Sequence, residues 1–170
     1  MDGVLSGKIL KITSYAHFVA LLSLLIVTVL FTGSLFYFNF DSDAIVIFGI
    51  YWVVYSLPSL YLHMEYWLKN RGEEYELSAS ELIRRKRGEE TVYKSEEIEE
   101  IVVYKSASLD KGGIPILGIE SYYFARIYLK SGEELLLTCL LSVKLEQILR
   151  QLTGIKMERK KRLFNLLDRK

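Results

Sequence analysis

Two long uncharged intervals near the start of the chain constrain its fold more than any other feature. Residues 12–40 and residues 44–64 contain no Asp, Glu, Lys or Arg. About 20 residues, each rising about 1.5 Å along a helix, are enough to cross a hydrocarbon core of about 30 Å. The sequence therefore predicts two transmembrane helices, over about residues 16–38 and 44–66.

Two other interpretations of these intervals are open. The first could be a secretory signal peptide, because Lys8 and Lys11 precede an apolar run. That run is too long for such a peptide, and no clear cleavage site of small residues precedes Asn39. The second interpretation is a pair of buried helices in a soluble protein, which rarely lack charge over such a length. Transmembrane helices remain the favoured prediction.

The charge distribution predicts how these helices are oriented. Residues 39–43 separate the two spans, so the helices must form a tight antiparallel hairpin with both outer ends on one side. This turn is acidic, whereas 20 of the 22 Lys and Arg residues follow Trp67. Because positive residues stay in the cytoplasm, we expect a multi-pass protein of the inner (cytoplasmic) membrane with both termini inside.

A few polar residues and one proline lie near or within the spans. His17 lies near the start of the first span and His63 near the end of the second, with Glu65 close by, so an antiparallel hairpin brings the histidines to similar depth. A metal site or proton relay is one interpretation; hydrogen bonding to water or headgroups is the favoured one. Pro58 predicts a kink, which is either a hinge or a tolerated transmembrane proline.

After Trp67 the pattern changes to short segments in which apolar and polar residues alternate. Such alternation is typical of strands, and Gly132 suits the tight turn of the clearest hairpin. The expected strands cover residues 74–79, 82–87, 91–94, 99–105, 121–130 and 134–141, with a weak one within 114–119. We therefore predict a small antiparallel β-barrel or sandwich.

One amphipathic helix is expected to cap this β-structure. Ser142 can act as its N-cap, and Gly154 is suited to its C-terminal end. Its apolar face would consist of Leu145, Ile148, Leu149 and Leu152. The predicted fold class is thus a transmembrane helical hairpin (residues 1–69), a cytoplasmic β-domain with a C-terminal helix (70–154) and a basic amphipathic tail (155–170).

This order of elements resembles a known family. Residues 75–84, residues 93–101 and the hairpin-plus-helix run of residues 126–149 are similar in pattern to bacterial pleckstrin-homology-like membrane proteins with two N-terminal transmembrane helices. The resemblance implies a PH-like fold at the cytoplasmic face and transfers no active-site residue. In some PH domains a basic loop between the first strands binds lipid headgroups, so the resemblance points to the corresponding position of this chain.

Two basic clusters are the candidate sites for a lipid or partner. The first lies at the position of that loop and consists of Arg84, Arg85, Lys86 and Arg87. The second consists of Arg159, Lys160, Lys161 and Arg162, in a tail with seven basic and two acidic residues. Leu163, Leu166 and Leu167 follow at helical spacing, which predicts a cationic helix on anionic inner-leaflet lipids; a frayed terminus is the alternative.

Enzyme motifs are absent from the sequence. No P-loop, GxSxG, HExxH or CxxC pattern occurs, and the glycine pair after Lys111 is interpreted as a turn. Cys139 is expected to be a small buried hydrophobic residue. We therefore expect no enzymatic activity, no cofactor and no metal. A nucleic-acid partner is not expected either, because the basic clusters come without a recognised reading module and the chain is expected to be held at the membrane.

The apolar loop of residues 106–120 has two interpretations: it dips into the bilayer or covers a partner, or, as we favour, it forms an edge of the core. For the whole chain, we expect a membrane-anchored binding or scaffolding module for a protein partner, a second copy or a lipid headgroup. The alternative is a subunit of an oligomeric transporter or membrane enzyme using Pro58, His17, His63 and Glu65. Two spans are too few to enclose a path, so that alternative requires several copies or another subunit.

Overall fold

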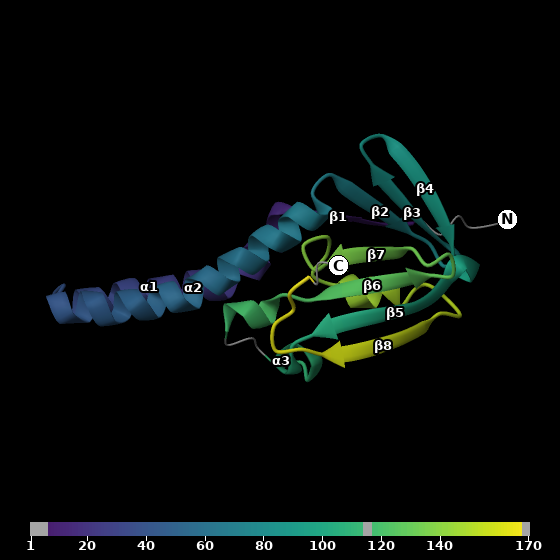
Figure 1. The fold of residues 1–170 in the computed structure, drawn as a ribbon. Coiled ribbons are helices and arrows are strands. Elements are labelled where there is room, and N and C mark those ends of the chain that lie inside the picture. Colours follow the sequence, from purple (N-terminus) through teal and green to yellow (C-terminus); the bar gives the residue numbers. More distant parts are fainter. Residues whose placement is uncertain (1–6, 114–116, 168–170) are drawn as a thin grey trace.

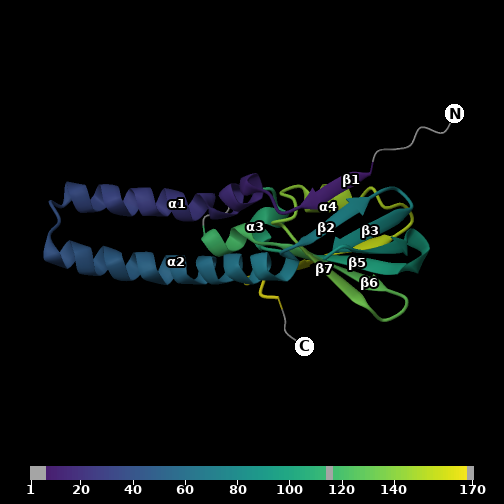
Figure 2. The ribbon, with the colours of Figure 1, turned by 90° about the horizontal axis from the view of Figure 1, so that it is seen from above.

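The computed structural model describes residues 7–113 and 117–167, and it consists of a long helical hairpin and a β-rich head (Figure 1). The hairpin is formed by α1 (Ser14–Tyr37) and α2 (Ser42–Asn70), which lie side by side and antiparallel (Figure 2). Both helices are long and apolar enough to cross a membrane, with mean hydropathy of 2.4 and 1.8 in their most apolar windows. The two predicted helices are confirmed, and α2 extends a further turn into the head.

The hairpin turn is tight because its residues adopt conformations suited to a sharp reversal. Asn39 and Phe40 have positive φ values of 50° and 55°. The Asp41 carboxylate then caps α2 by accepting hydrogen bonds from the backbone N–H groups of Asp43 (3.1 Å) and Ala44 (3.4 Å). Most apolar side chains further along the hairpin are exposed, so this part presents an apolar surface to its surroundings.

The first of two sheets in the head contains a strand from before the hairpin. Its order is β1 (Lys8–Lys11), β2 (Glu73–Leu77), β3 (Glu81–Lys86) and β4 (Glu89–Lys94), all antiparallel. The sequence analysis did not predict β1. Since β1 precedes α1 and β2 follows α2, the sheet joins the two ends of the hairpin.

The second sheet contains a strand from the C-terminal tail. Its order is β7 (Glu134–Thr138), β6 (Phe124–Leu129), β5 (Ile98–Lys105) and β8 (Lys156–Lys161). The strand β8 pairs parallel to β5, whereas the other pairs are antiparallel. The predicted cationic helix in the tail is therefore wrong over residues 156–161, because this segment completes the hydrogen bonding of the β5 edge. Residues 168–170 of the predicted tail lie outside the described residues.

The core of the head lies between the sheets and the joint with the hairpin. Its largest fully buried side chains include Tyr66 of α2, Tyr75, Tyr122 and Phe124. The two sheets do not close into a barrel within the described part of the chain. The expected strand within residues 114–119 is not seen at 117–119, where a short helix begins, and its residues 114–116 lie outside the described residues.

Four shorter helices of the described chain connect or flank the strands of the head. They are η1 (Ser95–Glu97), α3 (Ala107–Asp110), η2 (Gly118–Ser121) and α4 (Leu145–Leu149). The helix α4 is shorter than predicted, and Ser142 does not cap its first turn: the Ser142 hydroxyl accepts a hydrogen bond from the Lys144 backbone N–H (3.1 Å). Three residues of the predicted apolar face, Leu145, Ile148 and Leu149, are buried on α4, and Leu152 is also buried but follows the helix.

Candidate functional site

The end of α2 is fixed in the head by one fully buried asparagine. The Asn70 side-chain N–H group donates to Glu73 Oε2 and to the Leu136 carbonyl, both at 2.9 Å. Its Oδ1 accepts from the Thr138 backbone N–H at 2.8 Å. One side chain therefore connects α2 with both sheets, so the hairpin and the head are joined by buried hydrogen bonds.

A second set of hydrogen bonds attaches the end of the described chain to the same joint. The Tyr66 hydroxyl donates to the Asn165 carbonyl (2.7 Å), and the Asn165 side-chain amide donates to the Tyr122 carbonyl (2.7 Å). Leu167 is buried, whereas Leu163, Phe164 and Leu166 are exposed. Of the three leucines predicted for a tail helix, Leu163 and Leu166 are thus exposed, and Leu167 is buried at the joint.

The two histidines meet as the hairpin geometry predicted. His17 Nδ1 and His63 Nε2 are 2.9 Å apart, and His63 Nδ1 is 3.0 Å from the Tyr122 hydroxyl. The Glu65 carboxylate instead accepts a hydrogen bond from the Leu167 backbone N–H at 3.3 Å. Among the described residues, no group of three His, Cys, Asp or Glu side chains is arranged to hold a metal ion. The histidine chain therefore connects both spans to the head.

The first basic cluster is largely occupied by ion pairs within the first sheet. Arg84 and Lys86 contact Glu73 Oε1 at 2.6 and 2.7 Å, and Arg85 pairs with two other carboxylates. Burial alone would raise the pKa of Glu73, but hydrogen bonds from Lys86, Arg84, Asn70 and Tyr75 lower it to about 2. Arg87 differs: it is exposed in the β3–β4 turn, and no ion pair joins it to another described residue.

A shallow cleft places this cluster beside the ends of the hairpin. The cleft has a volume of about 340 Å³, and Arg85, Lys86 and Arg87 line it together with Lys11. Lys11 lies just before α1, and Gly72, on the same cleft, lies just after α2. The three cations of the β3–β4 hairpin therefore lie at the hairpin end of the first sheet, where a membrane crossed by α1 and α2 would begin.

The second basic cluster surrounds two carboxylates at the edge of the second sheet. Arg159 Nε is 2.8 Å from Glu146 Oε1, and Arg159 and Lys161 contact Asp110 at 3.6 and 3.1 Å. Lys105 also pairs with Glu146 at 2.5 Å. Burial opposes ionisation of Glu146, but hydrogen bonds from Lys105, Arg150 and Arg159 lower its pKa to about 2. Cations thus outnumber carboxylates in this cluster.

The remaining cations of this cluster lie toward the hairpin. The Arg162 guanidinium is 4.4 Å from the centre of the Tyr104 ring, a cation–π contact, and Lys160 is 3.9 Å from Glu158. Figure 1 shows that β5 and β8 both run toward the hairpin, so Lys105, Lys161 and Arg162 lie at that end. Sequence reasoning found both clusters but missed the carboxylates that pair with them.

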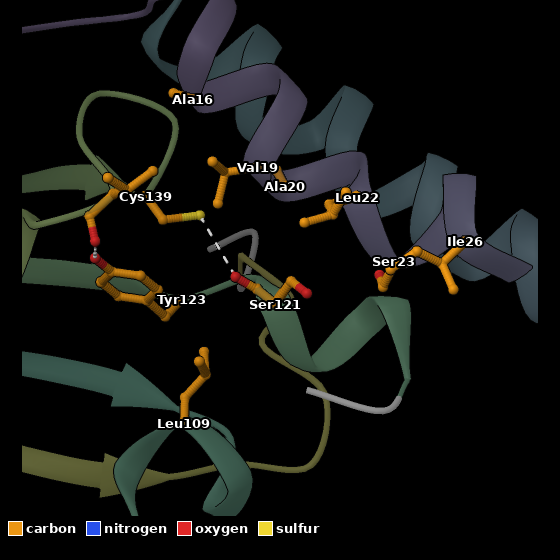
Figure 3. A pocket seen from close by; sticks show the side chains of 11 residues that line it. Ala16, Val19, Ala20, Leu22, Ser23, Ile26, Leu109, Ser121, Tyr123 and Cys139 are labelled. Carbon is orange, nitrogen blue, oxygen red and sulfur yellow. Dashed lines mark hydrogen bonds between the residues drawn. The ribbon is translucent and has the colours of Figure 1, made fainter. Parts of the chain in front are cut away.

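An apolar cavity between α1 and the head was not predicted from the sequence. It has a volume of about 280 Å³, and Figure 3 shows Val19 and Ala20 of α1 on one side of it and Tyr123 and Cys139 on the other. Cys139 is buried as expected, and burial raises the pKa of its thiol to about 12. None of the described residues that line the cavity is charged.

The helix η2 lies between the two spans beside this cavity. A Cβ atom on Gly118 would be only 2.4 Å from Ser59 Oγ of α2 and 3.3 Å from Ser23 Oγ of α1, so only glycine fits without a shift. Ile119 is buried and Leu117 is 41% exposed. The described part of the apolar loop therefore packs on the hairpin, and residues 114–116 of this loop lie outside the described residues.

Comparison with known proteins identifies the family of this chain. A family model described as PH domain matches residues 8–149, from the start of β1 to the end of α4. The chain belongs to the PH domain family. Searches of curated proteins and of solved structures found no match. PH domains are generally non-catalytic binding modules for proteins or lipids, which suggests a binding or scaffold role for this PH domain.

Proposed function

We propose that this chain is a two-span integral membrane protein whose cytoplasmic PH domain binds anionic lipid headgroups of the inner leaflet. The observation that carries the proposal is the position of the two basic clusters at the hairpin end of the two sheets. A bilayer crossed by α1 and α2 would meet the head at this end. Each Lys or Arg near an anionic surface contributes about 1 kcal/mol, so a few such cations suffice for a lipid preference.

The ion pairs divide the cations into two groups with different roles. Arg84 is paired with the buried carboxylate of Glu73, so it stabilises the fold and has little charge left for a ligand. Arg87 is exposed, and Lys161 is 59% exposed while paired with a single carboxylate. Arg87 and Lys161 are therefore the residues that we expect to contact headgroups, and Arg162, whose guanidinium lies over the Tyr104 ring, follows Lys161 at the same end of the sheet.

The alternative role in a transporter or membrane enzyme has less support. His17 and His63 hydrogen-bond to each other, and His63 also bonds Tyr122 of the head. Glu65 accepts from the backbone of Leu167. These groups are therefore engaged in holding the head on the hairpin, which favours an anchoring role.

The test compares lipid retention by full-length protein in native mass spectrometry. The protein is purified in mild detergent and given equal amounts of phosphatidylglycerol and phosphatidylcholine. We expect preferential retention of phosphatidylglycerol, and loss of that preference in the triple variant Arg87→Gln, Lys161→Gln and Arg162→Gln. The matched control replaces Lys94, Lys130 and Lys156 with Gln, because these residues lie at the opposite ends of β4, β6 and β8. Equal retention of both lipids by the wild-type protein, or equal losses in both triple variants, would contradict the proposal.

A further inference from the structure

The length of the hairpin shows how deeply the head would lie in a bilayer. A hydrocarbon core of about 30 Å corresponds to about 20 helical residues. Counted back from the tip at Tyr37 and forward from Ser42, this length ends close to His17 and Leu62. Helix tilt, or a tip placed in the outer headgroups, would move the boundary further toward the head.

Part of the head lies beyond this boundary, on the side of the hairpin tip. Gly118 of η2 is inserted between Ser23 and Ser59, which are several residues closer to the tip than His17 and Leu62. Phe164 shares an apolar hollow with Tyr51 and Pro58, closer still to the tip. If the hairpin spans the membrane, these parts of the head are immersed in the inner leaflet.

The exposed side chains in this region suit immersion. Leu117 is 41% and Phe164 48% exposed, and both line a hollow together with Tyr51 and Val54, two exposed apolar residues of α2. An apolar surface that continues from the hairpin onto the head indicates contact with a membrane or partner. Because it is continuous with the two spans, the acyl chains of the inner leaflet are the medium that fits it.

The cavity of Figure 3 lies between α1 and the head. It is lined by Val19, Ala20 and Ser23 of α1 on one side and by Leu109, Tyr123 and Cys139 on the other. The Tyr123 hydroxyl donates a hydrogen bond to the Val143 carbonyl at 2.9 Å. The ring of Tyr123 therefore lines the cavity, and its hydroxyl is already hydrogen-bonded. An apolar cavity excludes water, and an empty one loses dispersion contacts along its walls.

The cavity is bordered by exposed apolar residues of α1 and lies beside the second basic cluster. Leu22 and Ile26, which line it, are 37% and 49% exposed on α1. Leu109, on its opposite wall, is followed directly by Asp110, the carboxylate that pairs with Arg159 and Lys161. A phospholipid with a chain in the cavity would therefore have cations near its headgroup.

We propose that this cavity binds one acyl chain of an inner-leaflet phospholipid. The proposal rests on the proposed function, because it requires α1 and α2 to span the bilayer. The cavity would bind the acyl chain through apolar contacts, so this binding is distinct from recognition of the headgroup by the basic clusters. It would fix the head against α1 and hold it at a set depth in the leaflet.

The test is photo-crosslinking of the full-length protein in liposomes that contain a phosphatidylglycerol with a diazirine on one acyl chain. Peptide mapping is expected to find the label on the cavity wall contributed by the head, at or near Leu109 and Cys139. Label on exposed residues of the spans, such as Val29 and Val54, reports insertion of the hairpin separately. Label on the spans without label at the cavity wall would overturn the acyl-chain site alone, whereas absence of label from both would overturn membrane insertion as well.

A cavity-filling variant provides the second arm. Val143→Phe adds volume at the cavity from a connecting segment and should abolish the label at Leu109 and Cys139 while leaving the label on the spans. Val53→Phe, on an exposed position of α2 that does not line the cavity, is the matched control and should leave both unchanged. Unchanged labelling of the cavity wall in Val143→Phe contradicts the proposal, and if that variant does not fold, the wild-type map decides the question.

Discussion

Replacing Glu73 with glutamine removes the negative charge that pairs with Arg84 and Lys86 of the first basic cluster. The Glu73 side chain is 3% exposed and accepts from Arg84 (2.6 Å), Lys86 (2.7 Å), Tyr75 (2.8 Å) and Asn70 (2.9 Å). Its pKa of about 2, against an ordinary value of 4.5, corresponds to about 3 kcal/mol of stabilisation. Since Lys86 is 44% exposed and its charge is partly screened, we expect Glu73→Gln to lower the free energy of unfolding by about 2–3 kcal/mol at pH 7.

The pH dependence has a definite sign. The folded state lowers the pKa of Glu73, so its contribution is fully present above the ordinary pKa of 4.5 and is lost as pH falls toward 2. Glu146 has a similarly lowered pKa and contributes in the same range. The wild-type protein should therefore lose stability steeply between about pH 4.5 and 2, and Glu73→Gln should lose less over that range.

Chemical denaturation of the full-length protein in mild detergent, followed by tryptophan fluorescence, measures both effects. Trp67 is a suitable probe because it packs partly buried against the core at the joint. The matched control is Glu76→Gln, which removes the same charge from a carboxylate that is 29% exposed and pairs with exposed Arg85. We expect it to cost less than about 1 kcal/mol. The reasoning is refuted if both variants lose equal stability, or if Glu73→Gln keeps the wild-type acid dependence.

Three further outcomes can be checked on the same full-length protein. Asn70→Ala leaves the buried N–H group of Thr138 unpaired and should cost about 3 kcal/mol, measured by denaturation; a loss under about 1 kcal/mol would contradict it. Gly118→Val drives a side chain into Ser59 and should lower the melting temperature in a thermal scan; an unchanged value would show that η2 is not fixed there. Cys139, whose thiol has a pKa of about 12, should react with maleimide at pH 8 only after denaturation; rapid labelling of the folded protein would contradict its burial.

The two long helices and the clearest β-hairpin could be predicted from local sequence patterns. The absence of charge identified α1 and α2, and alternation with Gly132 identified the β6–β7 hairpin. The strand β1 was missed because four residues give too short a pattern, and its pairing partner β2 lies beyond the whole hairpin. Only the tertiary fold supplies that partner.

The tail shows why the candidate site was predicted only in part. A run of basic residues followed by leucines at helical spacing indicated a helix, but residues 156–161 pair with β5 instead. The charges of Arg159 and Lys161 are balanced by Glu146 and Asp110, which are distant in the sequence and invisible to a local pattern. The cavity was missed for the same reason, since Val19 and Cys139 meet only in the folded chain.

Cysteine accessibility in intact bacterial cells tests most directly whether the two apolar helices anchor the PH domain on the cytoplasmic side. In a Cys139→Ala background, single cysteines replace Asp43 at the hairpin tip and Lys94 on the head, both exposed positions. A membrane-impermeant maleimide should label the tip variant in intact cells and the head variant only after the membrane is permeabilised. Labelling of the head variant in intact cells, or recovery of the protein in the supernatant without detergent, would contradict this account.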